Sequence, residues 1–204
     1  MVALGASPVG WATRCPRGYH SPMSHYRRAN TAGGTYFFTV VTYRRQAFLC
    51  DEDVREAMRT AINRVRKGHP FQIDAWVLLP DHLHCLGTLP PDDADFSLRW
   101  NLIKRWVTRA CGERLFRMEW MTDSKRTHRE STLWQRRFWE HQIRDDRDYQ
   151  AHVDYVHFNP VKHGHVRRPV DWPYSSFHWC VREGVYVPGW GVGQVDEVAA
   201  GEPP

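Results

Sequence analysis

Two histidines separated by one leucine, His82 and His84, lie in the apolar stretch WVLLPDHLHCLGTL at residues 76–89. The end of this stretch reads as a β-strand. Side chains alternate across a strand, so both imidazoles project from one face, and Leu83 and Cys85 project from the other. Two neutral imidazoles side by side can bind one metal ion. They can equally be surface or hydrogen-bonded histidines, since the chain has 12 histidines and such a pair also arises by chance.

A second group of reactive residues lies in the stretch DYQAHVDYVHFNP at residues 148–160. At about 100° per residue, Asp148, His152 and Asn159 lie within roughly 60° of Tyr155 on one polar face of a helix. A tyrosine hydroxyl can attack a phosphodiester when a cation polarises the phosphate oxygens. Asn159 and the two histidines would then form a site for Mg²⁺ or Mn²⁺. The alternative is an ordinary amphipathic helix, in which the buried tyrosine hydroxyl only forms a hydrogen bond with a neighbouring group.

The rest of the sequence predicts the elements that must position these groups. Strands are expected at residues 34–43, 71–79, 82–89 and 133–141, helices at 51–68, 97–112 and 146–158, and an exposed loop at 117–132. Gly112 is expected to cap the second helix, and Asn159-Pro160 to end the third. The buried face of the second helix is predicted to carry Leu98, Leu102, Ile103, Trp106 and Ala110.

The order strand, helix, strand, strand, helix, strand, helix is typical of one fold class. It predicts a ferredoxin-like α+β sandwich, with an antiparallel sheet and helices on one face. In that arrangement the other sheet face is open to a ligand, and both imidazoles lie on it.

Composition limits the classes of partner and compartment. The net charge of +5 favours a polyanionic partner, most simply nucleic acid. The five cysteines are scattered without a C-x-x-C pair, which supports neither a disulfide framework nor a zinc ribbon and favours a reducing cytoplasm. No apolar run reaches the roughly 18 residues that a membrane span needs. Residues 1–22 are expected to be a disordered extension and residues 191–204 a disordered tail, and translation can begin at Met1 or Met23.

Five blocks of the chain, in matching order, resemble the REP-associated tyrosine transposases, bacterial relatives of the single-tyrosine HUH transposases. The blocks are HYRRANTAGGTYFFTVVTYRR, AWVLLPDHLHCL, LWQRRFWEHQIRDDRDY, HVDYVHFNPVKHG and DWPYSSFH. Five blocks in order are more specific than any single one. The resemblance implies one transposase domain over residues 23–190.

The resemblance also implies an activity and a role for each motif residue. Such proteins nick and rejoin single-stranded DNA at repetitive extragenic palindromic hairpins through a 5′-phosphotyrosine intermediate. The HUH motif falls on His82, Leu83 and His84, the nucleophile on Tyr155 and the third metal ligand on Asn159. The implied protein is a monomer, with a dimer as the alternative, in the cytoplasm and associated with the nucleoid.

Basic residues near these motifs are expected to bind DNA phosphates, which gives affinity with little sequence reading. They are Arg27, Arg28, Arg44, Arg45, Lys104, Arg105, Arg136, Arg137, Lys162, Arg167 and Arg168. Four aromatic residues among them offer faces on which unpaired bases can stack: Phe138, Trp139, Trp172 and Tyr174. For any single arginine, a solvated surface charge is the simpler interpretation.

Other functions are compatible with parts of this pattern. One is a regulator that binds DNA hairpins and has lost catalysis, although the two histidines, the tyrosine and the asparagine are all present. Another is a metal-dependent phosphodiesterase that releases free ends without a covalent step. A replication initiator of the wider HUH group is disfavoured by the small size of the chain and the lack of a helicase segment.

Overall fold

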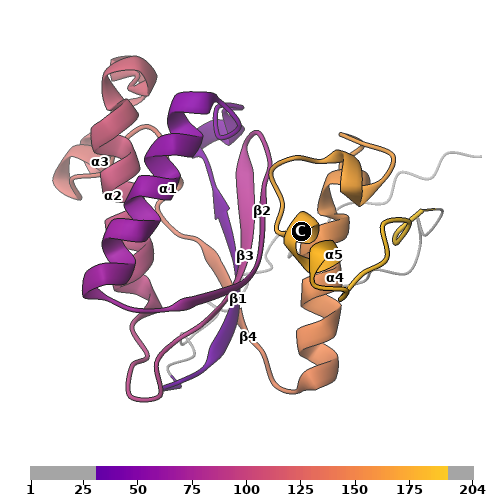
Figure 1. The fold of residues 1–204 in the computed structure, drawn as a ribbon. Helices are drawn as coiled ribbons and strands as arrows, with labels where there is room; N and C mark the ends of the chain where they lie inside the picture. The colour runs from indigo at the N-terminus through magenta and orange to yellow at the C-terminus, as the bar shows by residue number, and fades with distance from the viewer. Residues whose placement is uncertain (1–30, 193–204) are drawn as a thin grey trace, which may run out of the picture.

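A four-stranded sheet lies at the centre of the protein, of which the computed structural model describes residues 31–192 (Figure 1). The strands are β1 (Thr35–Val41), β2 (Gln72–Leu78), β3 (His82–Thr88) and β4 (Trp139–Gln142). Their order is β2-β3-β1-β4, and every neighbouring pair is antiparallel. This order confirms the predicted ferredoxin-like α+β fold.

The helices fall into two groups, one on each side of the sheet. They are α1 (Glu52–Gly68), α2 (Phe96–Leu115), α3 (Asp123–Thr127), α4 (Asp146–Lys162) and α5 (Phe177–Arg182), with short 3₁₀ turns η1 (Tyr43–Arg45), η2 (Met118–Trp120) and η3 (Pro169–Asp171). On α1, Val54, Met58, Ala61 and Val65 recur at helical spacing and are buried against the sheet. The periodic pattern of residues 51–68 therefore predicted this helix correctly.

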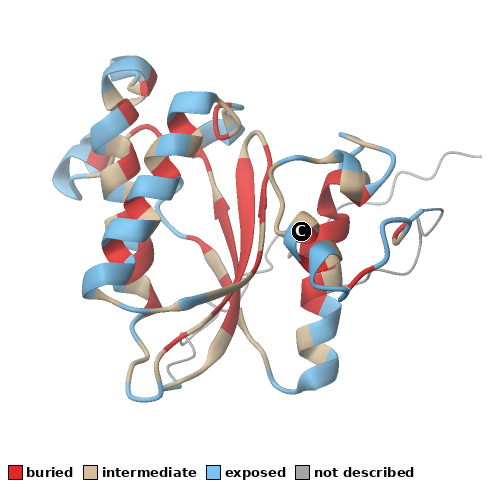
Figure 2. Ribbon diagram, viewed as in Figure 1, coloured by how far each residue is buried: buried red, intermediate tan, exposed pale blue. Residues whose placement is uncertain are grey.

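The sheet differs from the expectation in one respect, because its second face is not open. α1 and α2 pack on the face that carries Leu83 and Cys85 of β3, as expected. α4 and α5 cover the opposite face, where Val156 and Phe177 join the apolar side chains of β2 and β3 (Figure 1). Both faces of the strands and the middle of α4 are therefore buried (Figure 2). A ligand must approach from the edge of this second layer.

α4 extends past the Asn159-Pro160 pair that was expected to end it. Pro160 lies in the last helical turn, where the loss of one backbone N–H costs a single hydrogen bond. The helix ends instead at Lys162, and Gly164, just past the cap residue His163, adopts φ of +70°. His165 N donates to the Pro160 carbonyl (2.9 Å), and Gly164 N donates to the Val161 carbonyl (2.9 Å). These two bonds form a Schellman motif, so Lys162 stays on the helix two turns after Tyr155.

Two further elements differ from the sequence expectations. α2 continues beyond Gly112 to Leu115, so this glycine does not cap it. The segment 117–132, expected to be a loop, contains η2 and α3 and buries Lys125. The ammonium of Lys125 lies 3.8 Å from the centroid of the Tyr43 ring, which anchors the segment to η1.

The terminal predictions fall largely outside the described residues. The expected extension 1–22 lies there entirely, as do Arg27 and Arg28 and all but the first two residues of the expected tail 191–204. Within residues 31–192, no helix is both long enough and apolar enough to cross a bilayer.

Candidate active site

The two histidines of β3 project from the same sheet face, toward α4. Their ring centroids lie 5.0 Å apart and the rings are nearly perpendicular, at 81°. Antiparallel pairing with β1 places His82 opposite Val41 and His84 opposite Thr39. Both imidazoles are buried, with 2% and 0% of their surface exposed, because the second helical layer covers this face.

Each imidazole is held at its Nδ1 atom. His82 Nδ1 lies 2.6 Å from Asp81 Oδ1, and His84 Nδ1 lies 2.9 Å from Thr39 Oγ1. Metal-binding histidines commonly hold their second ring nitrogen in this way, by a carboxylate or another acceptor that fixes the ring. Both imidazoles are therefore oriented with Nε2 directed away from these partners, as a metal site requires.

Asp81 in turn binds an arginine of η1. Arg45 Nη1 donates to Asp81 Oδ2 at 3.1 Å. Burial opposes ionisation of this carboxyl, but the hydrogen bonds from His82 and Arg45 outweigh that effect and lower its pKa to about 2. Asp81 is therefore ionised at neutral pH and stabilises the proton on His82 Nδ1. Arg45 has a left-handed backbone conformation, with φ of 50°, and so does its neighbour Arg44, with φ of 57°. This conformation is unfavourable for residues other than glycine.

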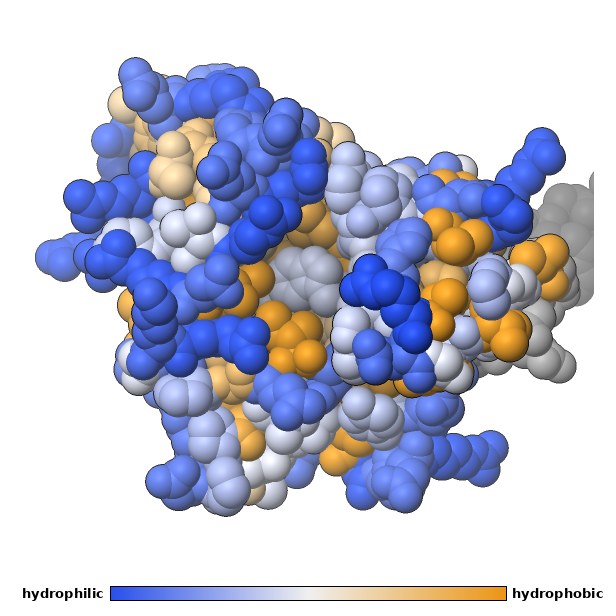
Figure 3. Space-filling view, in the orientation of Figure 1, coloured by the Kyte–Doolittle hydropathy of each residue, from blue (hydrophilic) through white to orange (hydrophobic). Residues whose placement is uncertain are grey.

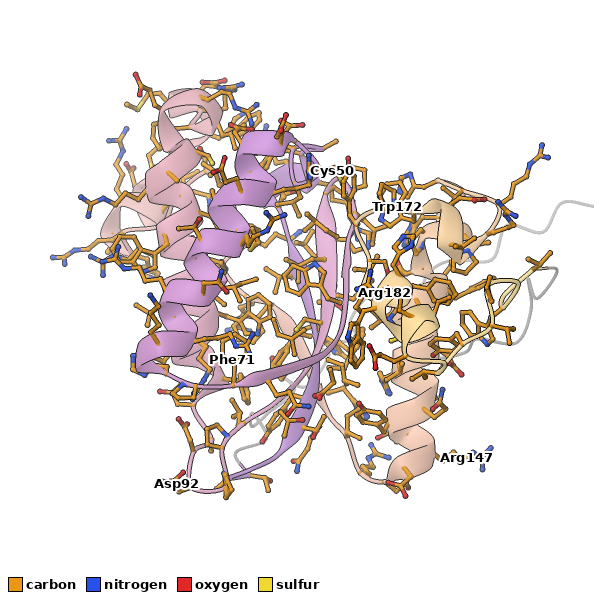
Figure 4. All side chains as sticks on the ribbon, in the orientation of Figure 1. Cys50, Phe71, Asp92, Arg147, Trp172 and Arg182 are labelled. Atoms are coloured by element: carbon orange, nitrogen blue, oxygen red, sulfur yellow. The ribbon has the colours of Figure 1, made fainter. Side chains whose placement is uncertain are left out.

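Tyr155 lies on α4 against the same imidazoles. Its ring centroid is 5.3 Å from that of His84, and only 1% of its surface is exposed. Phe37 of β1 packs against both groups, with ring centroids 5.3 Å from His84 and 5.7 Å from Tyr155. Side chains from the sheet and from α4 and α5 fill the space between the two layers (Figure 4). The fold therefore fixes the phenol beside the histidines.

Lys162 covers the tyrosine from the solvent side. Its Nζ donates to the Tyr155 hydroxyl at 3.1 Å and lies 4.5 Å from the ring centroid. The ammonium group favours negative charge on the phenolic oxygen, because it places a cation at hydrogen-bond distance. Lys162 was expected to contact DNA phosphates, and the structure places it at the candidate nucleophile.

Asn159, one turn after Tyr155, has a side chain that is fully buried and lacks internal partners. Neither Oδ1 nor Nδ2 of Asn159 forms a hydrogen bond within residues 31–192, and the same holds for Nε2 of His82. Leaving a buried polar group unsatisfied costs about 1–3 kcal/mol, so such atoms call for an explanation. A metal ion held by the Asn159 amide oxygen and by His82 and His84 would satisfy them. The residues present therefore fit a divalent cation.

A second polar cluster joins β4 to the start of α4. Asp148 Oδ2 accepts from His141 Nε2 at 2.8 Å, and Asp148 Oδ1 lies 3.0 Å from His152 Nδ1. Burial opposes ionisation of Asp148, but the bonds from His141 and the Arg144 amide lower its pKa overall. The sequence placed Asp148 and His152 near Tyr155, but the part played by His141 was missed, because strand β4 is only four residues long.

Ligand-type atoms of this cluster lie within 4.8 Å of one another, which is close enough to suggest a metal site. The two imidazoles, however, are stacked with centroids 4.6 Å apart and planes 13° apart. An ion lies in the plane of each imidazole that binds it, so two parallel rings cannot both point at one ion. As oriented, His141 of β4 binds the Asp148 carboxylate and ties α4 to the sheet, whereas His152 Nδ1 lies 2.8 Å from the Asp148 backbone carbonyl within α4.

Within residues 31–192, the cations that were expected to bind DNA lie in several separate places. Lys104, Arg105 and Arg136 line a hollow of about 380 Å³ between α2 and residues 128–136. This hollow is on the α1–α2 side of the sheet, and therefore away from Tyr155. Lys104 Nζ is engaged there by the Gln135 carbonyl at 2.7 Å.

The remaining basic residues lie elsewhere. Arg44 stacks over Trp120, with 5.3 Å from the guanidinium carbon to the ring centroid. Arg137 and Arg167 are exposed, whereas Arg168 forms an ion pair with Asp171. Of the predicted cations in the described part of the chain, Arg45 and Lys162 are the two that lie at the candidate site.

The chain is similar to known proteins over most of its length. Residues 32–159, which include all four candidate site residues, match the family described as transposase IS200 like. A REP-associated tyrosine transposase of Escherichia coli (strain K12) is 45% identical over 180 residues, which cover 88% of this chain and 98% of that protein.

A solved structure gives the same result. A REP-associated tyrosine transposase bound to a REP hairpin superimposes with a TM-score of 0.73 at 45% identity, covering 89% of this chain and 99% of the other. The similarity thus spans nearly the full length of both relatives, and the family match at residues 32–159 contains the sheet and Tyr155. The chain belongs to the IS200-like transposase family and, within it, to the REP-associated tyrosine transposases.

Proposed function

We propose that this protein is a metal-dependent endonuclease and strand transferase that acts on single-stranded DNA at repetitive palindromic hairpins. The substrate class follows from the relative whose structure holds a REP hairpin. The observation that carries the chemistry is the position of Tyr155, packed against His84 with its hydroxyl bound by Lys162. The cytoplasm, at the nucleoid, is the compartment in which this substrate is found.

In the proposed reaction, Tyr155 is the nucleophile and Lys162 stabilises its oxygen. The Tyr155 oxygen attacks the phosphorus, the bond from phosphorus to the 3′ oxygen breaks, and the products are a 5′-phosphotyrosine and a DNA end with a free 3′ hydroxyl. The phenolic proton is lost to solvent, and the departing 3′ oxygen takes up a proton. Lys162 stabilises the phenolic oxygen before attack. Attack by a 3′ hydroxyl on the phosphotyrosine reverses the step and rejoins the strands.

His82, His84 and Asn159 would hold Mg²⁺ or Mn²⁺. When bound, the cation polarises the oxygens of the scissile phosphate and neutralises charge that develops on them. Asp81 and Thr39 keep the two imidazoles oriented for this purpose. Because all of these residues come from one chain, a monomer contains a complete candidate site, and we propose the monomer as the working unit.

The test is a covalent adduct between protein and DNA. Wild-type protein, Mn²⁺ and a single-stranded oligonucleotide that carries a palindromic hairpin should give a species that survives denaturation. Tyr155→Phe should give none. Tyr149→Phe, on the apolar side of the same helix, is the matched control and should keep full activity.

Two results would redirect the assignment. An adduct formed by Tyr155→Phe would exclude this residue as nucleophile. Hairpin binding by the wild type with no adduct under Mg²⁺ or Mn²⁺ would instead support a regulator that binds DNA without cutting it.

A further inference from the structure

We propose that four aromatic side chains, His163, His165, Trp172 and Tyr174, form a stacking row that binds the single-stranded DNA next to the hairpin. The proposal rests on the proposed function, since it assigns a path to the strand that reaches Tyr155. It also names residues outside the candidate site, and it can be tested without catalysis.

The row leads away from the candidate metal site in short steps. The His163 ring centroid lies 5.0 Å from that of His82, and the His165 centroid lies 6.2 Å from that of His163. Trp172 follows at 5.2 Å from His165, and Tyr174 at 5.5 Å from Trp172. His163–His165 and His165–Trp172 are both stacked pairs, with planes 27° apart. The rings therefore connect the site to the edge of β2 without a break.

The backbone holds this row in place. The Schellman motif at the end of α4 fixes the positions from which His163 and His165 project. Trp172 Nε1 donates to the Leu78 carbonyl at 2.9 Å, and Leu78 N donates to the Tyr174 carbonyl at 2.8 Å. Trp172 lies on the sheet side of the α4–α5 layer (Figure 4). Rings fixed before binding lose little conformational entropy when a base packs on them.

The side chains of the row are accessible to a strand. His163 and His165 are exposed, and Trp172 and Tyr174 are half-buried. A fully structural row would be expected inside the core, where Phe177 and Tyr155 lie. Unpaired bases expose both faces and stack on such rings, whereas the bases of a duplex are already stacked on one another.

The far end of the row opens into a hollow with the chemistry of a nucleotide site. The hollow, of about 550 Å³, lies between α1 and residues 173–176 and is lined by Trp76, Tyr174, Arg55 and Arg59 among others. The Arg55 guanidinium carbon lies 4.6 Å from the Tyr174 ring centroid. In the space-filling view, hydrophobic residues gather in the hollow between the α1 side and the α4–α5 side, and hydrophilic residues surround it (Figure 3).

The charges along the row also match a polyanion. Lys162 is at its start, Arg167 lies between His165 and Trp172 in sequence, and Arg55 and Arg59 lie at its end. Asp171 is an acidic group in the same segment, but it is paired with Arg168. Aromatic faces for bases beside cations for phosphates are the combination by which single strands are bound.

The test measures DNA binding with the Tyr155→Phe protein, so that no strand is cut. Fluorescence anisotropy compares a hairpin without an extension with hairpins carrying about six unpaired nucleotides on the 5′ or the 3′ side. We expect one of the two extensions to tighten binding by at least about tenfold, the order of one base stack. His165→Ala and Trp172→Leu should remove most of this gain and leave binding of the hairpin alone unchanged.

Two variants control for folding and for general loss of aromatic surface. Trp172→Phe keeps a ring and should retain most of the gain. Trp179→Leu removes a tryptophan that is 51% exposed on α5, outside the row, and should have no effect. Thermal unfolding of each variant checks that the fold is kept.

The proposal is overturned if neither extension improves binding, or if Trp179→Leu reduces the gain as much as Trp172→Leu does. This failure is distinct from failure of the proposed function. A protein without the row would still form the Tyr155 adduct, and a protein without catalysis would still show the effect of the extension.

Discussion

Lys162 places its ammonium nitrogen 3.1 Å from the hydroxyl oxygen of Tyr155 and 4.5 Å from the centroid of its ring. One exposed side chain thus both binds and covers a phenol that is otherwise buried. Tyr155 is 1% exposed in this arrangement, and a phosphate group is a better partner for the ammonium than a neutral phenol. We therefore expect Lys162 to contact the phosphate that binds beside Tyr155.

Replacing Lys162 should slow adduct formation. Lys162→Met removes the cation that stabilises the phenolic oxygen and the phosphate, and we expect a rate at least about tenfold lower, with partial recovery in Lys162→Arg. Single-turnover kinetics of the adduct measure the rate. Lys67→Met, which removes an exposed lysine at the end of α1, should match the wild type. A Lys162→Met rate equal to the wild-type rate would refute this role.

Asp81→Asn should weaken metal binding while keeping the shape of the side chain. The carboxylate that holds His82 Nδ1 becomes a neutral amide, and loss of such a partner typically lowers metal affinity about 10- to 100-fold. Titration of Mn²⁺ followed by electron paramagnetic resonance measures the affinity. Asp92→Asn, at an exposed loop position, provides the control. Unchanged Mn²⁺ affinity in Asp81→Asn would show that this contact does not support a metal site.

Phe37 and Phe38 offer a matched pair on opposite faces of β1. Substitution of either residue by leucine should lower the free energy of unfolding of the protein by about 1–2 kcal/mol, because each ring is buried among other aromatic rings. Only Phe37 contacts His84 and Tyr155, so Phe37→Leu alone should also reduce the rate of adduct formation. Chemical denaturation and adduct kinetics separate the two effects. Equal rates in the two variants would contradict a positioning role for Phe37.

His157 should make the fold sensitive to acid. Burial lowers its pKa from 6.5 to about 4, and its Nε2 binds Ser176 Oγ at 2.8 Å. Between pH 6.5 and pH 4, His157 is protonated in the unfolded chain but not in the folded chain. The free energy of unfolding is therefore highest above pH 6.5 and falls as the pH drops toward 4. The loss is about 3 kcal/mol. Denaturation of metal-free protein at several pH values measures it, and His157→Gln should remove this part of the dependence.

The local pattern of the sequence predicted the elements on which the candidate site is built. Alternation along β3 placed His82 and His84 on one face and Leu83 on the other, because a strand has a fixed period of two. The helical spacing of Val54, Met58 and Val65 likewise identified α1 and its buried side. Both inferences needed only geometry within one element.

Inference was weaker where packing between distant elements decides the outcome. On α2 the predicted face was shifted, since Leu98 is 37% exposed and Ala110 is exposed, whereas Trp100, Val107 and Cys111 are buried. Arg99 accounts for part of this shift. It is buried at 3% exposure because its guanidinium binds Asp93 and the Pro70 carbonyl. A charged residue gives no sign in sequence that such partners exist.

The cover over the second sheet face and the part played by His141 in the cluster at Asp148 escaped prediction for the same reason. Whether α4 lies over the imidazoles depends on the length of the chain between β4 and Asp146, and on Phe177 and Tyr186 packing behind the helix. The role of His141 depends on the pairing of a four-residue strand with β1. Neither is encoded in a periodic pattern.

Gly164, just past the end of α4, has a backbone conformation of the opposite hand to the helix, and apart from its chain neighbours no atom lies within 4 Å of where a Cβ would be. Glycine is therefore favoured at this position because of the left-handed backbone torsion and not because space for a side chain is lacking. An L-alanine would fit the space but strain the turn by about 1–2 kcal/mol, whereas a D-alanine introduced by chemical ligation would adopt the same torsion at ease. The position at which the helix that carries Tyr155 and Lys162 ends thus depends on one residue that can adopt a left-handed backbone conformation.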